Sequence, residues 1–338
     1  DAMKLSPLAL AQQSGGVAAI PQYLRDGFEM KYFPRGIAFA DVPVPVLADL
    51  PRADVEAFSI DDDATTEVDD ALSLTDLAGG GKRVGIHIAA PALAIAPGSD
   101  MEKTIAERQS TVYFPGDKIT MLPENWIAAF SLDAGGYRPA VSIYFDVDAD
   151  FNVSAPVCKI EAVNIVENLR IQAIEPHFNA QSGLDAEGAA LFAHHRDLIW
   201  FYQLAIARQK ARGKYEPERA AQYDYSIELA SDGLVSVARR ERGSPIDTLV
   251  SEMMILANST WAQMLDQVGL PGLFRVQPAG KVRMSTQSEP HIGMGVQHYG
   301  WFTSPLRRAA DYINQKQLIS LIDPQAAPLY QKNDADLF

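Results

Sequence analysis

One acidic stretch constrains the fold of this chain more than any other feature. Residues 61–70 carry six carboxylates, and the apolar segments 58–60 and 71–74 beside them both have the character of β-strands. So many like charges destabilise a folded chain through mutual repulsion unless cations neutralise them. Mg²⁺ prefers oxygen ligands and is commonly held by a few carboxylates together with substrate phosphates. The stretch therefore indicates either a metal site or a solvated acidic loop.

A calcium-binding EF-hand loop does not fit this stretch. If Asp61 were the first ligand of such a loop, its sixth position would be Thr66 instead of glycine. Its twelfth position would be Leu72 instead of the bidentate glutamate. The acidic residues therefore need another arrangement of ligands.

The composition is that of a soluble globular protein. The chain has 338 residues, enough for one large domain or two ordinary ones, with 47% hydrophobic residues and a net charge of −14. That charge argues against a partner bound over a broad basic face, although local basic patches and bound metal still allow nucleic-acid binding. No apolar run could span a membrane and no signal peptide is visible, so we expect a cytoplasmic protein. The single cysteine, Cys158, excludes an internal disulfide and a cysteine-based zinc site, and we expect it to be buried on a strand.

The order of apolar and turn residues predicts a mixed α+β fold. Alternating apolar residues predict β-hairpins at 71–88, 141–160 and 225–237. No Gly-Lys-Ser/Thr follows the glycine triplet at 79–81, so we interpret it as a hairpin turn and not as a phosphate-binding loop. Helical periodicity predicts a helix over 99–110.

Two longer helices are expected in the second half of the chain. The first covers 184–212, where His194 and His195 point about 100° apart, so they are expected at the surface or the core edge and not on one metal. The second begins at Pro245 with Ser244 as its N-cap. Glu252 is the polar exception among the apolar residues of this second helix.

The chain is expected to form one principal domain. Residues 1–50 are rich in proline and should form a short lead-in, with a helix at 7–13, that is not an independent domain. Residues 51–330 should form a single α+β domain in which sheet hairpins are surrounded by long helices.

A second charged segment lies near the end of the chain. Thr303 or Ser304 is expected to cap a helix whose first turn presents backbone amides together with the guanidinium groups of Arg307 and Arg308. That arrangement suits a phosphate dianion or the charge that develops during phosphoryl transfer. The alternative is an ordinary helix start with two surface arginines.

Taken in order, five segments of the chain resemble the catalytic (RNB) domain of the ribonuclease II and ribonuclease R family. Five collinear segments over some 250 residues are far more specific than any one of them. They are residues 60–72, 84–89, 113–116 with 121–123, 250–258 and 302–311.

The resemblance implies an RNB-type fold and a processive 3′→5′ exoribonuclease that hydrolyses single-stranded RNA to nucleoside 5′-monophosphates by a two-metal mechanism. It implies Mg²⁺ as the cofactor, with Mn²⁺ as an alternative, and single-stranded RNA as the partner of a monomeric enzyme. Asp70 and Arg307 match catalytic positions. The metal-ligand positions are occupied by Asp61, Glu67, Asp69 and Asp70. The RNA-binding positions are assigned to Tyr113, Glu252, Ser304 and Arg308.

The chain also departs from the family pattern. Glu67 stands where the best-known members have aspartate, and positions that hold an aromatic in the family fall near Val166 and at Ala309. A histidine expected on the last helix is replaced by Gln315. No complete cold-shock barrel or C-terminal OB-fold barrel is visible. A catalytically impaired RNB-like protein that binds RNA as a regulator or scaffold is therefore the alternative, and a globular protein with an acidic loop and no nucleic-acid role is a third.

Overall fold

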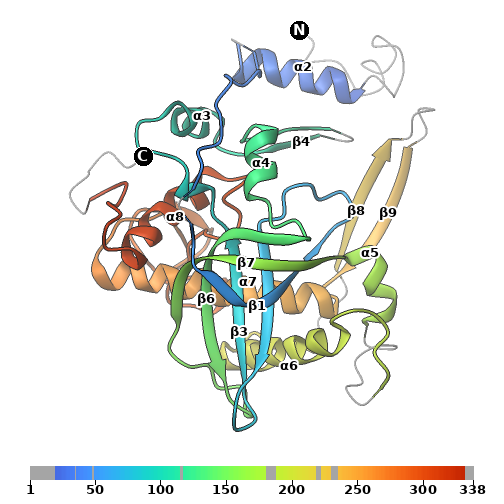
Figure 1. Ribbon diagram of the computed structural model, residues 1–338. Helices are drawn as coiled ribbons and strands as arrows, with labels where there is room; N and C mark the ends of the chain where they lie inside the picture. Colours follow the sequence, from blue (N-terminus) through green and yellow to red (C-terminus); the bar gives the residue numbers. More distant parts are fainter. Residues whose placement is uncertain are drawn as a thin grey trace.

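A closed five-stranded β-barrel lies at the centre of the molecule (Figure 1). The structure is a computed structural model that describes residues 20–34, 36–47, 49–114, 117–179, 188–217, 222–229 and 235–331. Neighbouring strands of the barrel are antiparallel, except that the first and last strands pair in parallel and so close it. In order round the barrel the strands are β1 (Arg52–Asp61), β2 (Asp70–Asp76), β3 (Lys82–Ala89), β6 (Gly136–Val147) and β7 (Val157–Arg170).

The register of the barrel follows from its alternating apolar residues. On one face, Leu72 of β2 pairs with Ile86 of β3, and Ile86 pairs with Ile143 of β6. These side chains are buried, and a one-residue slip would turn each of them to the opposite face of the sheet. The predicted hairpins at 71–88 and 141–160 are thereby confirmed.

The opposite face of the same strands carries a buried polar network. The ring of His87 on β3 hydrogen-bonds to the hydroxyl oxygens of Ser73 on β2 and Ser142 on β6, at 2.8 Å on each side. Gly85 makes room for these contacts, because a Cβ at this position would lie 2.3 Å from the Ser73 hydroxyl oxygen. Burial lowers the pKa of His87 to about 3, so the barrel holds a neutral imidazole.

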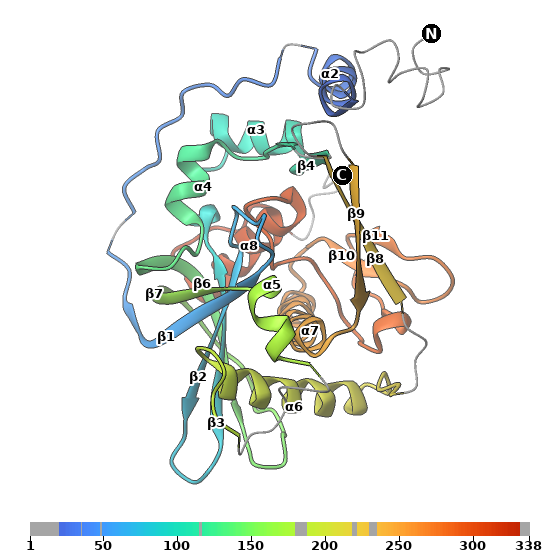
Figure 2. The same ribbon diagram turned by 90° about the vertical axis from the view of Figure 1, so that its right-hand side faces the viewer.

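Helices surround the barrel, which confirms the predicted α+β class. Helices α6 and α7 pack against each other beside it (Figure 2). The longer helices are α2 (Ile20–Tyr32), α3 (Asp100–Arg108), α6 (His195–Ala211), α7 (Pro245–Val268) and α8 (Ala309–Ile322). The shorter ones are α4 (Glu124–Phe130), α5 (Ile171–Ile174) and the 3₁₀ helices η3 (Pro91–Leu93), η4 (Glu175–His177) and η5 (Ile292–Met294).

The predicted starts of the two long helices can be compared with those in the structure. Ser244 caps α7 as expected, accepting a hydrogen bond from the amide of Asp247 at 3.2 Å. The helix predicted over 184–212 begins only at His195, since His194 has a left-handed backbone conformation. His194 stacks on the ring of Phe58 in β1 with centroids 4.2 Å apart, which confirms its place at the core edge.

Two-stranded ribbons complete the fold. They are β4 (Val112–Phe114) with β5 (Asp117–Ile119), β8 (Gln222–Leu229) with β9 (Val235–Arg242), and β10 (Phe274–Val276) with β11 (Arg283–Ser285). The ribbon β8–β9 confirms the hairpin predicted at 225–237, and its connecting turn lies outside the described residues. Arg240 of β9 joins this ribbon to the body through ion pairs with Glu175 and Asp247.

The N-terminal lead-in contains a helix that the sequence did not predict. The predicted helix at 7–13 lies outside the described residues, whereas α2 covers part of the segment expected to be extended. Phe28 of α2 packs edge-on against Phe114 of β4 at a centroid distance of 5.6 Å, and Arg25 forms an ion pair with Asp117 of β5. Helix α2 therefore contacts the outer end of the β4–β5 hairpin.

Two further expectations concern the surroundings of the single cysteine and the lengths of the helices. Cys158 lies on β7 as predicted but is half-buried, with its sulfur 3.4 Å from the indole nitrogen of Trp261. Within the described ranges, no helix is both long and apolar enough to cross a membrane.

The neutral His87 predicts how the stability of the barrel depends on pH. Its pKa in the folded protein lies below the ordinary value of 6.5, so its stabilising contribution is complete above pH 6.5 and declines as the pH falls toward 3. Compared with His87→Gln, whose amide can still donate and accept, the wild type should lose about 1.4 kcal/mol of unfolding free energy per pH unit in this range. Urea unfolding of both proteins between pH 7 and pH 4 measures this difference, and parallel pH profiles would contradict it.

Candidate active site

The acidic stretch connects two neighbouring barrel strands. Strand β1 ends at Asp61 and β2 begins at Asp70, so these two carboxylates lie at the same end of the barrel. Burial and the nearby Asp61 raise the pKa of Asp70 to about 7. Burial also raises the pKa of Asp61, although the Ser59 hydroxyl donates a hydrogen bond to it at 2.5 Å. The fold thus brings together two carboxylates that repel each other.

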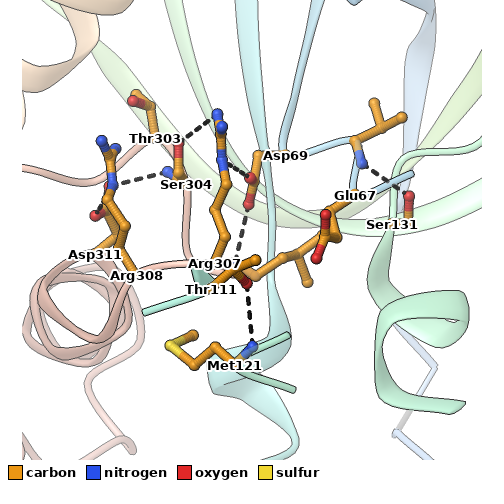
Figure 3. Close-up of polar contacts among 12 residues, drawn as sticks. Glu67, Asp69, Thr111, Met121, Ser131, Thr303, Ser304, Arg307, Arg308 and Asp311 are labelled. Carbon is orange, nitrogen blue, oxygen red and sulfur yellow. Dashed lines mark hydrogen bonds and ion pairs between the residues drawn. The ribbon is translucent and has the colours of Figure 1, made fainter. Parts of the chain in front are cut away.

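Asp69 is held by the distant segment that contains Arg307 (Figure 3). Its side chain is buried, and its two oxygens accept hydrogen bonds from Arg307 Nε at 2.8 Å and from the amide of Leu306 at 2.9 Å. Burial raises the pKa of Asp69 to about 7, and the charge of Arg307 opposes this rise. The carboxylate of Asp69 is therefore already paired with a cation of the protein.

Arg307 belongs to a tight turn and not to a helix. The carbonyl oxygen of Ser304 accepts hydrogen bonds from the amides of Arg307 and Arg308, and the Ser304 hydroxyl accepts one from Arg307 Nη2 at 3.1 Å. Helix α8 begins after this turn, at Ala309, with Arg308 in the capping position. The prediction that Thr303 or Ser304 caps this helix is therefore wrong, because the Ser304 amide is instead held by Asp311 inside the first turn of α8.

The two arginines predicted to act together lie on either side of Ser304 and have different partners (Figure 3). Arg308 donates hydrogen bonds to both carboxylate oxygens of Asp311, at 2.7 and 2.8 Å, and its guanidinium lies 5.1 Å from the ring centroid of Trp301. Arg308 thus lines a cavity on the Trp301 side. Of these two arginines, only Arg307 lines the cavity beside the acidic stretch.

That cavity has a volume of about 630 Å³, enough for a nucleotide-sized ligand. Its lining residues are Asp62, Ala64, Thr65, Glu67, Tyr113, Phe114, Asp117, Lys118 and Arg307. Tyr113 projects from β4 with 58% of its surface exposed, as a residue that stacks on a base must. We call this the acidic-loop cavity.

Glu67 lines this cavity and is 5% exposed. One of its oxygens, Oε2, accepts a hydrogen bond from Lys118 Nζ at 2.6 Å, while Oε1 is buried without a hydrogen-bond partner. The loop is fixed next to Glu67, where the Val68 amide donates to the Ser131 hydroxyl at 3.0 Å. Glu67 is thus neutralised by the neighbouring β5 strand.

Glu252 lies elsewhere in the molecule. It is buried on α7 and forms an ion pair with Arg212 after α6, and it is not among the residues that line the acidic-loop cavity. Its other oxygen, Oε2, is buried without a hydrogen-bond partner. Its assignment to RNA binding stays a prediction.

The described residues contain no group of three or more His, Cys, Asp or Glu side chains arranged to hold a metal ion. Mg²⁺ does not require such a group, since it is usually bound by one or two carboxylates, several waters and substrate phosphates. Asp61 and Asp70 form a carboxylate pair of this kind. The structure pairs the other two predicted ligands, Glu67 and Asp69, with Lys118 and Arg307. The residues present therefore fit one such ion more readily than two.

Lys118 is the site residue that the sequence reasoning missed. A signal for it exists, because Pro-Gly at 115–116 favours a two-residue turn. Such a turn pairs Phe114 with Asp117 and Tyr113 with Lys118, which is the pairing in the structure. The hairpin thus presents an aromatic ring and an ammonium group to one cavity.

The departures from the family pattern also have definite places. Val166 lies on β7 and is 37% exposed, and Ala309 begins α8. Gln315 is buried, and its amide joins α8 to the end of the barrel by donating to the carbonyl of Ala89 at 2.8 Å and accepting from the amide of Ala92 at 3.3 Å. These two hydrogen bonds explain why a polar side chain is buried at position 315, and they give Gln315 a structural role.

The comparison with known families agrees with this architecture. The model of the RNB domain matches residues 52–284 and 279–324. The chain therefore belongs to the RNB family. Exoribonuclease 2 of Glaesserella parasuis is 26% identical over an alignment that covers 80% of this chain and 51% of that protein. Exoribonuclease 2 of Vibrio parahaemolyticus is also 26% identical, over 81% of this chain and 50% of that protein. The chain spans about half the length of the curated relatives it matches.

Solved structures share the fold at low sequence identity. The exoribonuclease Dss1 of Candida glabrata, in an active-site mutant form, superposes with a TM-score of 0.73 at 19% identity, over 94% of this chain and 46% of that chain. RNase R of Mycoplasma genitalium, in complex with ribose-methylated single-stranded RNA, gives 0.69 at 16% identity, over 88% and 55%. Yeast Ssd1, a pseudonuclease, gives 0.66 at 15% identity, over 84% and 42%. One fold is thus shared by proteins described as nucleases and by one described as a pseudonuclease.

The repulsion between Asp61 and Asp70 predicts that the site destabilises the metal-free protein. Because the folded pKa of Asp70 lies above its ordinary value of 3.8, the contribution of this carboxyl group to stability is fully present below pH 3.8 and is lost as the pH rises through 7. With a chelator present at pH 8, Asp70→Asn should therefore raise the unfolding free energy, by about 1–3 kcal/mol since Asp70 keeps some contact with solvent.

The control for this measurement is Asp76→Asn, which removes an exposed carboxylate from the same strand β2. It should change the unfolding free energy by less than about 0.5 kcal/mol. Urea unfolding at pH 8 and pH 4 should show that the gain from Asp70→Asn disappears at pH 4. A loss of stability at pH 8 would contradict the repulsion.

Proposed function

We propose that this protein is a Mg²⁺-dependent 3′→5′ exoribonuclease that hydrolyses single-stranded RNA to nucleoside 5′-monophosphates. The observation that carries the proposal is that Asp69 and Arg307, far apart in the sequence, form an ion pair beside the Asp61–Asp70 pair. This places a guanidinium group next to carboxylates of the kind that bind Mg²⁺, at a cavity that also exposes Tyr113. Membership of the RNB family and the exoribonuclease names of its relatives support the same activity.

Each residue has a definite part in the proposed reaction. Asp61 and Asp70 hold Mg²⁺, which when bound lowers the pKa of a water molecule and stabilises negative charge on a phosphate. Arg307 faces the same phosphate and stabilises the charge that develops on its non-bridging oxygens. Asp69 positions Arg307 by holding its Nε, so the guanidinium need not be ordered when the substrate binds. A second ion, held by Glu67 and Asp69, remains a prediction from the family resemblance.

Tyr113 would contribute to binding without reading the sequence of the RNA. Stacking of a base on an exposed aromatic ring stabilises the complex by about 1–3 kcal/mol per base, and every base has a face on which to stack. A nuclease that removes one nucleotide after another needs this tolerance. Tyr113 and Arg307 line one cavity, so the terminal base and its phosphate can be bound together.

The proposal is tested with a single-stranded RNA oligonucleotide labelled at its 5′ end. With Mg²⁺ or Mn²⁺, a denaturing gel should show progressive shortening from the 3′ end, and chromatography should identify nucleoside 5′-monophosphates. A chelator should stop the reaction, and Asp70→Asn should abolish it because one carboxylate of the ion-binding pair is lost. Intact RNA after incubation with wild-type protein that demonstrably binds Mg²⁺ would refute the proposal.

Arg307 and Arg308 provide a matched pair for testing the phosphate contact. We expect Arg307→Met to lower kcat by about 10²–10³-fold, since it removes a donor that stabilises charge formed in the transition state. Arg308→Met should have a much smaller effect on kcat, because Arg308 faces Asp311 and Trp301 on the other side of the turn. Steady-state rates with a short RNA measure both variants, and equal losses would contradict this assignment.

A second candidate function is RNA binding without cleavage. The observation in its favour is that two of the four predicted metal ligands are paired with side-chain cations, in a fold that is shared with a pseudonuclease. This function requires that wild-type protein bind single-stranded RNA but release no mononucleotide with either metal. It also requires that Asp70→Asn leave the affinity for RNA unchanged. The gel assay together with a binding titration separates the two functions.

A further inference from the structure

The contact between Lys118 and Glu67 has a consequence for the metal content of the site. Lys118 Nζ lies 2.6 Å from Glu67 Oε2 and also hydrogen-bonds to the Thr66 hydroxyl, so two consecutive residues of the acidic stretch hold the ammonium group. The Glu67 side chain is 3% exposed and that of Lys118 is 26% exposed. An ion pair so far removed from solvent is screened much less than a surface pair.

The backbone around Lys118 keeps its ammonium group at this place. Lys118 is the cross-strand partner of Tyr113 in the β4–β5 hairpin. The hairpin is anchored from outside by α2, through the ion pair of Arg25 with Asp117 and the packing of Phe28. Its position beside the acidic stretch is therefore set by packing and by charge together.

Glu67 needs a cation because of its burial. A carboxylate taken out of water is costly unless a charge and hydrogen bonds compensate for it, and here Oε1 has no hydrogen-bond partner at all. In the family pattern that the chain resembles, a divalent ion would supply the compensation. In this protein an ammonium group already does so, and both Lys118 and Glu67 line the acidic-loop cavity.

We propose that Lys118 is a built-in cation that takes the place of a divalent ion at Glu67. The site then binds one divalent ion, at Asp61 and Asp70, and Glu67 positions Lys118 instead of ligating metal. This inference rests on the proposed function for the location of the first ion. The cavity then presents two fixed side-chain cations, Lys118 and Arg307, to the phosphates of a bound RNA.

The test counts bound ions with Mn²⁺ as the probe. Electron paramagnetic resonance of free Mn²⁺ during a titration gives the number of ions bound per chain. The wild type should bind one ion, and Lys118→Met should bind two, because the Glu67 carboxylate then loses its ammonium partner and becomes available to the probe. Lys118→Arg should still bind one, since it keeps the positive charge.

The double variant Glu67→Gln/Lys118→Met shows whether Lys118 acts through Glu67. It should return the count to one, because the neutral amide no longer requires a cation. Asp70→Asn should remove the first ion and so identifies its site. Circular dichroism of each variant confirms that the count is measured on folded protein.

Two results would overturn the inference: two ions bound to the wild type, or a count unchanged by Lys118→Met in folded protein. The RNA assay described above is scored separately. Intact RNA together with the expected ion counts would refute the proposed nuclease but leave the role of Lys118 standing. Cleavage of RNA by a wild type that binds two ions would do the opposite.

Discussion

The ion pair between Asp69 and Arg307 joins the end of the acidic stretch, just before β2, to the turn that precedes α8, and the rest of the site is arranged around it. Asp69 is buried just before β2, so its carboxylate is stable there only if groups from elsewhere compensate for the lost hydration. The turn at 304–308 supplies those groups, with the Leu306 amide at 2.9 Å and Arg307 Nε at 2.8 Å. Because both donors come from one tight turn, the guanidinium group compensates the charge of Asp69 and is also held in a fixed position.

The same need for compensation explains how six carboxylates coexist in ten residues. The carboxylates of the stretch are compensated in different ways. Glu67 is paired with Lys118 and Asp69 with Arg307, whereas Asp61 and Asp70 repel each other across the ends of β1 and β2. The repulsion that remains is concentrated where an added cation would relieve it. On the proposed function, relief of this repulsion would contribute to the affinity of the site for the ion.

The barrel decides which of these residues meet. Strands β2 and β3 form one antiparallel hairpin and β6 and β7 form another, and alternating apolar residues predict both. The parallel pairing of β1 with β7 joins residues more than 100 positions apart, for example Ile60 and Leu169. No local sequence pattern predicts a pairing between residues so far apart. This pairing closes the barrel, and it fixes the end of β1, and with it Asp61, beside β7.

The α+β class, the strand pairs within hairpins, the N-cap of α7 and the residue types of the site could be predicted from the sequence, because these depend on local periodicity and turn chemistry. The sequence did not determine the start of α8 or the separate partners of Arg307 and Arg308, which donate hydrogen bonds to Asp69 and Asp311 respectively. Nor did it determine how the acidic charges are shared, since the choice between a bound ion and a protein cation depends on distance. The tertiary structure brings Lys118 to Glu67 and leaves Asp61 close enough to Asp70 to repel it, because burial makes the nearest available cation decisive for each carboxylate.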